Sequence, residues 1–179
     1  MIPPGEECIH ATLIRVADIG VLLTGPSGSG KSQLALELVQ RGHCLAADDL
    51  VILRRHGENR LHGRAAEGGE GFLVVRGLGV LDVVKLFGPR AAVSATDIHL
   101  QLSLLFEPGT DDPLRGQRTV QCVLGVTLEA LALQASRPGL ATLVEVAARD
   151  TRLRREGYHA EQMLAAGLAA RLRGDSSCE

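Results

Sequence analysis

The segment GPSGSGKS, residues 25–32, constrains this chain more than any other part of its sequence. It fits the pattern GxxxxGK[ST], with an apolar stretch before it (Ile19–Thr24) and a stretch of helical apolar period after it (Ser32–Gln40). A strand, a glycine-rich loop and a helix N-terminus in this order direct backbone N–H groups at anionic oxygens. The segment therefore predicts a phosphate-binding loop in an α/β fold.

The residue types of the loop suit this chemistry. Gly25, Gly28 and Gly30 allow positive φ and a close approach of the backbone to phosphate oxygens. Lys31 supplies positive charge and the Ser32 hydroxyl suits Mg²⁺. A chain with 21 Gly produces GxxxxG by chance, but Lys31 is one of only two Lys among 19 basic residues, which argues against chance. The predicted nucleotide-binding loop comprises Gly25, Pro26, Ser27, Gly28, Ser29, Gly30, Lys31 and Ser32.

Two adjacent acids follow the predicted helix. Asp48 and Asp49 stand in CLAADDLVIL, which we interpret as one apolar strand. Carboxylates there are costly unless they are paired, bound to metal or close to water. In phosphate-loop folds the end of the neighbouring strand lies beside Mg²⁺, so one acid would order the metal and the other accept a hydroxyl proton. The alternative is a strand end that caps a turn. His10, taken alone, suits a structural role.

Other segments predict the surrounding elements. Ala11–Val16 predicts a strand before the loop strand, with Asp18 in the turn between them. Leu100–Phe106 and Val120–Leu133 predict further strands, and the polar segment Arg54–Glu70 predicts a hairpin or a loop.

The C-terminal third has helical periodicity. One helix ends near Gly157 and a second covers Ala160–Leu172. We expect the inner side of the second helix to carry Met163, Leu164, Leu168 and Leu172. The simplest reading of the nearby arginines is a solvated helix face, and the alternative is a docking patch for an acidic partner; these are Arg149, Arg152, Arg154 and Arg155.

Composition excludes several functions. The chain has 19 basic and 21 acidic residues and no Trp, so it has neither the charge nor the stacking platforms of a nucleic-acid-binding protein. No apolar stretch approaches the roughly 20 residues of a membrane span, and the N-terminus does not resemble a secretory signal. The four Cys include no CxxC pair, which favours a reducing cytosol. We therefore expect one cytoplasmic domain, residues 1–179, with no nucleic-acid or membrane partner.

Three segments, in order, resemble the catalytic domain of the HPr kinase/phosphorylase family: GPSGSGKSQLALELVQRGHCLAADDLV, VRGLGVLDVVKLFG and LVEVAARDTRLRREGY. That family phosphorylates a serine of HPr, the phosphocarrier protein of the phosphotransferase system, and can remove the phosphate by phosphorolysis. The resemblance extends from His10 to Tyr158. It implies a P-loop kinase-like α/β domain with a phosphoenolpyruvate-carboxykinase-like core and strands flanked by helices. It also implies the use of ATP and Mg²⁺, HPr as partner and a homohexamer.

The resemblance assigns roles to individual residues. His10, 21 residues before Lys31, takes the position of the active-site histidine. Lys31 matches the phosphate-binding lysine, and Ser32 and Asp48 match a magnesium site. Asp49 matches the catalytic base, which becomes an acid in the reverse reaction. The arginines implied are Arg76, in the signature segment, and Arg115, with Arg118 close enough to compete for the second role.

Three features depart from the family. Val74 stands where a metal-binding Glu is usual, so either Mg²⁺ has fewer protein ligands or Glu67 or Glu70 substitutes. The family's stretch associated with dephosphorylation is reduced to Arg137–Leu140, which bears on phosphorylase activity. The family's N-terminal domain is missing, which suggests a form consisting of the catalytic domain only. Two alternatives follow: a P-loop kinase with another acceptor, and a catalytically silent nucleotide-sensing subunit.

Overall fold

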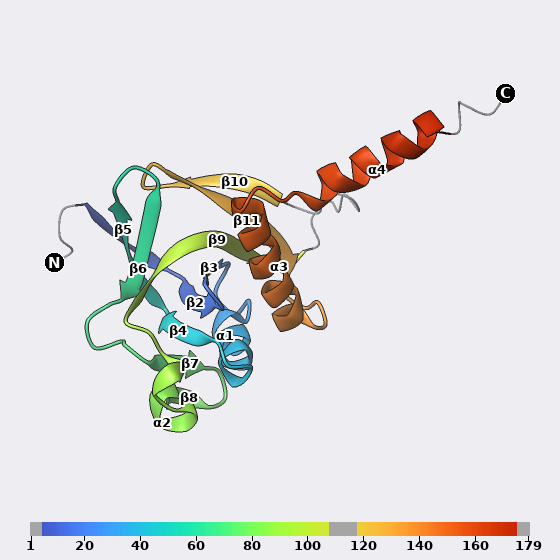
Figure 1. Cartoon of the computed structure of the whole chain (residues 1–179). Coiled ribbons are helices and arrows are strands. Elements are labelled where there is room, and N and C mark those ends of the chain that lie inside the picture. The colour runs from blue at the N-terminus through green and yellow to red at the C-terminus, as the bar shows by residue number, and fades with distance from the viewer. Residues whose placement is uncertain (1–4, 108–117, 175–179) are drawn as a thin grey trace.

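The computed structural model describes residues 5–107 and 118–174. Within these residues nine strands form one mixed sheet (Figure 1). Its main path runs β1 (Glu6–His10), β5 (Leu50–His56), β6 (Arg60–Ala65), β9 (Ala95–Leu105), β3 (Ile19–Thr24), β2 (Thr12–Val16) and β4 (Cys44–Ala47). The later strands β11 (Val126–Gln134) and β10 (Arg118–Val123) extend the sheet beside the second half of β9. A small second sheet pairs β7 (Phe72–Val75) with β8 (Gly79–Asp82).

Apolar side chains fill both faces of the central strands. Val21 and Leu23 of β3 point to one face, which helices α1 (Lys31–Gln40) and α3 (Leu140–Arg155) cover. Leu22 points to the other face and packs in a cluster with Val51 and Leu53 of β5. All buried members of that second cluster come from strands or strand ends, so the sheet curls over its own face. The α/β class is confirmed, with helices on one side of the central strands and strands on the other.

Strand β3 and the end of α1 lie where predicted, whereas α1 begins at Lys31 and β2 at Thr12, each one residue from the predicted start. The β2–β3 turn contains Ala17, at φ 52°, and Asp18. Helix α1 ends where Gly42, at φ 94°, donates its N–H to Val39 O at 2.9 Å. The next N–H, of His43, reaches Leu38 O at 3.1 Å, which completes a glycine-terminated helix end.

The segment containing the two acids is not one strand, so that prediction is wrong. Strand β4 ends at Ala47 and pairs with β2, whereas β5 begins at Leu50 and pairs with β1 and β6. Asp48 and Asp49 form the bend between them, and Asp49 adopts φ 66°, in the left-handed region. Apolar residues on both sides of a bend give the same sequence pattern as one continuous strand.

Two other predicted segments are hairpins. Arg54–Glu70 contains the β5–β6 turn at Gly57, and Val120–Leu133 turns at Leu124 and Gly125 between β10 and β11. The signature segment, residues 75–88, forms the β7–β8 turn, strand β8 and the short helix α2 (Val83–Phe87). The 3₁₀ turn Pro89–Ala91 follows it. The β7–β8 hairpin places Val74 and Arg76 beside the phosphate loop.

The final helix differs from its prediction. Helix α3 is confirmed and ends before Gly157, at φ 91°. Helix α4 (Ala160–Gly174) leads away from the sheet in Figure 1. Three of the side chains expected on its inner side are instead more than half exposed: Met163, Leu164 and Leu168. The side chain of Leu172, the fourth, lies outside the described part of the chain. Helical periodicity identifies an apolar face but not the surface that covers it. No helix of the described chain has both the length and the apolar character of a membrane span.

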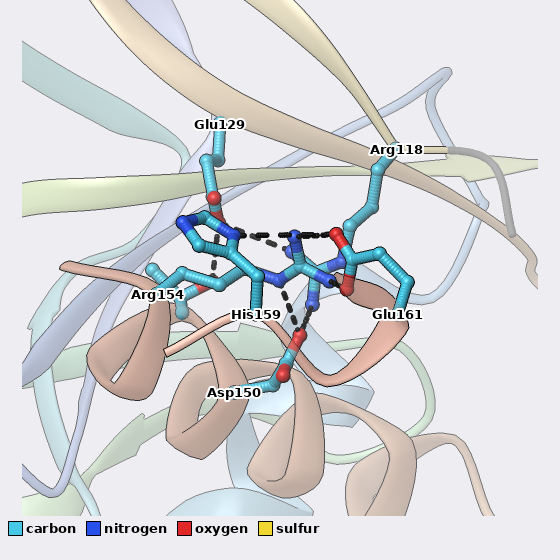
Figure 2. A network of polar contacts seen from close by, with 7 residues as sticks. Arg118, Glu129, Asp150, Arg154, His159 and Glu161 are labelled. Atoms are coloured by element: carbon cyan, nitrogen blue, oxygen red, sulfur yellow. Dashed lines mark hydrogen bonds and ion pairs between the residues drawn. The ribbon is translucent and has the colours of Figure 1, made fainter. Parts of the chain in front are cut away.

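Polar contacts join the start of α4 to the body of the protein (Figure 2). Arg154 donates to both carboxylate oxygens of Glu161 at 2.9 Å and to Asp150 at 2.8 Å. Arg118 donates to Glu129 at 3.1 Å and also to Asp150. The hydrogen bonds that Arg154 donates to Asp150 and Glu161 raise the pKa of Arg154 above its usual range. Arg154 is therefore not part of a solvated face, unlike its exposed neighbours Arg149, Arg152 and Arg155.

Candidate active site

The loop between β3 and α1 has the backbone conformation that its glycines predict. Gly25, Gly28 and Gly30 have φ of 139°, 81° and 90°. A Cβ at Gly25 would lie 2.5 Å from the backbone oxygen of Leu104 on β9, so only glycine fits between the loop and the sheet. The sheet itself thus fixes the path of the loop.

Positive charge gathers inside this loop. Lys31 begins α1, is only 6% exposed, and donates from Nζ to Gly25 O at 3.0 Å and to Pro26 O at 3.3 Å. Helix α1 has no acidic residue in its first turn, and its N-cap residue Gly30 has no side chain to satisfy the first N–H groups. These N–H groups and the lysine ammonium favour an anion at the loop.

Asp48 lies opposite the start of the helix. Ser32 Oγ is 3.1 Å from Asp48 Oδ1 and 3.0 Å from Oδ2. Thr12 Oγ1 donates to Oδ1 at 2.6 Å, and the backbone N–H of Val74 donates to Oδ2 at 3.0 Å. Donors from β2, α1 and β7 therefore fix this carboxylate on both sides, which offsets the cost of taking it partly out of water.

Asp49 points toward His10 instead. His10 Nδ1 lies 2.9 Å from Asp49 Oδ1 and 3.0 Å from the backbone oxygen of Asp49. Both side chains are more than half exposed, at 52% for His10 and 63% for Asp49. Asp48 is thus held among several donors, whereas Asp49 faces solvent beside a histidine. These two environments suit two different chemical roles.

These side chains surround a cavity of about 470 Å³. The predicted residues that line it are His10, Ser27, Gly28, Gly30, Lys31, Ser32, Asp48, Asp49 and Arg76. Gly25, Pro26 and Ser29, also predicted to bind nucleotide, are not part of the lining, and the hydroxyl of Ser29 is buried with no partner among the described residues. Three further residues line the cavity without having been predicted as ligands: Thr12, Gln33 and Val74.

The arginines separate into different settings. Arg76 lines the cavity, and its Nη2 would lie 3.8 Å from a Cβ built on Gly28. Arg118 is not in the cavity wall, because Glu129 and Asp150 hold its guanidinium in the network of Figure 2. Arg115 lies outside the described residues, so its predicted role is a proposal below.

The donors near Ser32 suit a hard cation. Ser32 and Asp48 present oxygen atoms at the loop, and Mg²⁺ commonly takes one or two carboxylates together with substrate phosphates and water. Val74 contributes only its backbone N–H to Asp48, and neither Glu67 nor Glu70 lines the cavity. In residues 5–107 and 118–174, no group of three or more His, Cys, Asp or Glu side chains forms a ready-made metal site. The residues present thus fit a magnesium ion that would take some of its ligands from the protein and the others from a bound phosphate chain and water.

A buried lysine in a glycine loop, with a serine–aspartate pair at the helix start, defines this chain as a P-loop phosphate-binding domain of the kinase-like class. The family model for the HPr Serine kinase C-terminal domain matches residues 5–168, and the chain belongs to this family.

Curated relatives agree. The chain is 41% identical over 165 residues to the HPr kinase/phosphorylase of Bacillus subtilis, covering 90% of this chain and 53% of that protein. The HPr kinase/phosphorylase of Azoarcus sp. is 40% identical over 171 residues, covering 93% of this chain and 55% of the relative. The chain therefore spans about half the length of the curated relatives it matches.

A solved structure supports the fold. The structure of the Hpr(Ser) kinase/phosphatase from Coxiella burnetii has a TM-score of 0.78 and 34% sequence identity. The match covers 88% of this chain and 98% of that chain. The predicted P-loop kinase-like fold is confirmed.

Proposed function

We propose that this chain is an ATP-dependent kinase that phosphorylates a serine of the phosphocarrier protein HPr. The observation that carries the proposal is the division of the acidic pair: Asp48 is fixed beside Ser32, and Asp49 faces the cavity beside His10. A kinase needs one carboxylate for the metal and another for the attacking hydroxyl. The names of the relatives support HPr as the acceptor.

The charges at the loop suit the γ-phosphoryl group. Lys31 and the N-terminal amides of α1 neutralise phosphate oxygens, and Arg76 adds positive charge from the other side of the cavity. Arg115 is proposed to act with them, by the family resemblance alone. Asp49 accepts the proton of the serine hydroxyl as the new oxygen–phosphorus bond forms and ADP leaves. His10 holds one oxygen of Asp49, so the carboxylate keeps its direction.

Magnesium fits this site through Ser32 and Asp48. The ion, when bound, neutralises charge on the phosphate oxygens. Ser32 contributes its hydroxyl oxygen and can keep its proton directed at Asp48. Thr12 and the Val74 N–H keep Asp48 in place from the other sides.

The reverse reaction is proposed on the names of the relatives, which include phosphorylase. Inorganic phosphate would attack the phosphoserine phosphorus, pyrophosphate would form, and Asp49 would return a proton to the serine oxygen. Arg137–Leu140, the reduced stretch, is not part of the cavity lining. Release of pyrophosphate from phosphorylated HPr with inorganic phosphate tests this activity.

We further propose that the chain forms one cytoplasmic domain, residues 1–179, in a homohexamer. The main sheet includes strands from β1 to β11, which supports a single unit. Exposed apolar side chains on the β7–β8 hairpin and α2 support association of copies; they are Phe72, Val74, Leu78, Val80, Leu86 and Phe87. Light scattering of the purified chain measures the oligomeric state.

Incubation with ATP, Mg²⁺ and purified HPr tests the kinase directly. We expect phosphate on one HPr serine by mass spectrometry and none on an HPr variant with alanine at that serine. Phosphate on a different protein or on a small molecule would favour the first alternative, a kinase with another acceptor. Nucleotide binding without transfer to any acceptor would favour a nucleotide-sensing subunit.

A further inference from the structure

Thr12 is an unusual residue for its place in the fold. It is the first residue of β2 and is completely buried, between Ala11 and Leu13, which are also buried. A buried hydroxyl costs free energy unless it has a hydrogen-bond partner, and valine has nearly the same shape without that cost. The partner of Thr12 is the carboxylate of Asp48, 36 residues further along the chain.

The bond between them is short. Thr12 Oγ1 donates to Asp48 Oδ1 at 2.6 Å, within the range of hydroxyl-to-carboxylate bonds to an ionised acid. Thr12 also forms part of the wall of the cavity. Its hydroxyl therefore acts on the side chain that faces Ser32 at the start of α1.

Asp48 matters more for metal binding in this site because Val74 carries no carboxylate. Val74 offers its backbone N–H to Oδ2, and Asp49 is occupied with His10. When a site has a single carboxylate for its metal, the direction of that carboxylate matters more. Donors behind a metal-binding carboxylate typically change metal affinity about 10- to 100-fold when they are removed.

We infer that Thr12 is a positioning residue for magnesium, acting through Asp48. This rests on the proposed function only in its use of Mg²⁺ with nucleotide, not in the identity of the acceptor. The hydroxyl of Thr12 holds Oδ1, the Val74 N–H holds Oδ2, and Ser32 completes the arrangement from the helix.

The test measures Mg²⁺ binding rather than turnover. A fluorescent, non-hydrolysable ATP analogue is bound to the protein, and Mg²⁺ is titrated at constant nucleotide. We expect Thr12→Val to raise the apparent Kd for Mg²⁺ about 10- to 100-fold. Affinity for the analogue without Mg²⁺ should stay within about threefold of the unmodified protein, because the loop contacts are intact. Thr12→Ser retains a hydroxyl and should recover most of the Mg²⁺ affinity.

Thr151→Val provides a matched control. Thr151 is 1% exposed, its hydroxyl donates to the Glu129 carboxylate at 2.8 Å, and it is not part of the lining of the active-site cavity. This variant removes the same kind of buried bond and should leave the Mg²⁺ titration unchanged. If both Thr→Val variants shift the titration equally, the effect is a general loss of stability and the inference fails.

Further outcomes separate the inference from the proposed function. In kinase assays, Thr12→Val should raise the Mg²⁺ concentration for half-maximal rate, and excess Mg²⁺ should restore kcat. An unmodified protein that phosphorylates HPr, with Thr12→Val binding Mg²⁺ equally well, overturns the role of Thr12 alone. If Thr12→Val binds Mg²⁺ more weakly but the unmodified protein does not phosphorylate HPr, the positioning role of Thr12 is supported and HPr is not the acceptor. If Thr12→Val is poorly folded, Thr12→Ala and Thr12→Ser replace it. Thr12→Ala should lose Mg²⁺ affinity, and Thr12→Ser should recover it.

Discussion

One nitrogen atom of His10 contacts both the side chain and the backbone of Asp49. Nδ1 of His10 lies 2.9 Å from the carboxylate oxygen and 3.0 Å from the backbone oxygen of Asp49. The left-handed conformation of Asp49, at φ 66°, accompanies this arrangement, and such conformations are costly for residues other than glycine. The backbone and the side chain of Asp49 thus have one common partner, and Oδ2 has no partner among the described residues. In the proposed mechanism, this second oxygen accepts the proton of the attacking hydroxyl.

Asp49→Asn should nearly abolish phosphorylation. Loss of a positioned general base typically costs about 10²- to 10⁴-fold in rate, while the loop and Lys31 remain intact. Transfer of labelled phosphate from ATP to HPr measures the rate, and a fluorescent nucleotide measures binding, which should change less than about threefold. Asp18→Asn, in the β2–β3 turn, is the control for removal of a carboxylate. Normal transfer by Asp49→Asn would remove this residue from the mechanism.

His10→Ala should have a smaller effect, about tenfold in rate, because His10 orients Asp49 and does not take the proton in the proposed mechanism. The double variant with Asp49→Asn should be no slower than Asp49→Asn alone, since residues that act as a unit are not additive. Rates from the same transfer assay give the double-mutant cycle. Additive losses would show that His10 acts independently of Asp49.

Lys31→Ala should weaken nucleotide binding and also slow transfer. Its ammonium lies inside the loop, and a hydrogen bond to a charged group contributes about 1.5–3 kcal/mol, or roughly 10- to 100-fold. Titration with a fluorescent ATP analogue measures the affinity. Lys85→Ala is a matched control, because Lys85 is the other lysine of the chain and is exposed on α2. Equal affinities for the two variants would contradict the phosphate-binding role of the loop.

Local patterns identified the loop, the start of α1, the Gly42 helix end and the two acids, because each depends on residues that are neighbours in sequence. The bend at Asp49 was missed because apolar strands flank it on both sides. Thr12 was missed because its partner is 36 residues away, although a polar residue in an apolar strand was a signal.

Contacts between residues distant in sequence also explain the wrong predictions near the C-terminus. Arg154 looks like a surface arginine by its helical position, but its carboxylate partners lie one turn away and on the next helix. The apolar residues of α4 have the periodicity of a packed helix, yet within the described structure they are exposed. A sequence pattern does not contain the distances between elements that decide such cases.

Protonation of His99 should destabilise the fold. Burial lowers the pKa of His99, and the positive charge of Arg155 lowers it further, against the opposing effect of Asp97. Its Nδ1 accepts the N–H of Gly20 at 3.1 Å, a bond that a proton on this atom would break. Because the folded pKa is below the usual 6.5, the unfolded chain takes up the proton first as the pH falls. The contribution of neutral His99 to the free energy of unfolding should therefore be complete above about pH 6.5. It should decrease as the pH falls below about 6.5 and should be lost once the folded pKa is passed.

Urea unfolding at pH 5.5 and 7.5 measures this effect. His99→Asn keeps an acceptor near Gly20 but does not titrate, so its unfolding free energy should differ less between the two pH values than that of the unmodified protein. His56→Asn, at an exposed position in β5, should retain the original pH dependence. The same dependence in all three proteins would mean that His99 is not the group responsible.

Val74→Glu should strengthen Mg²⁺ binding. The Val74 side chain lines the cavity and is 52% exposed, so a longer, charged side chain has room without being buried. Its backbone N–H already holds Asp48, which places the new carboxylate near the proposed ion. Repulsion from Asp48 opposes the gain, and we expect a net tightening of roughly tenfold, equivalent to about 1.4 kcal/mol. The Mg²⁺ titration with a bound ATP analogue measures it.

Val146→Glu separates a local ligand from added negative charge. Val146 is 54% exposed on α3 and is not part of the cavity lining, so this variant adds the same charge at similar exposure elsewhere. Its Mg²⁺ titration should match that of the unmodified protein. If Val74→Glu and Val146→Glu bind Mg²⁺ equally, the ion does not approach position 74, and its placement beside Asp48 and Ser32 is wrong. If only Val74→Glu transfers phosphate, the unmodified chain is the nucleotide-sensing subunit rather than the kinase, because a single missing carboxylate then accounts for its silence.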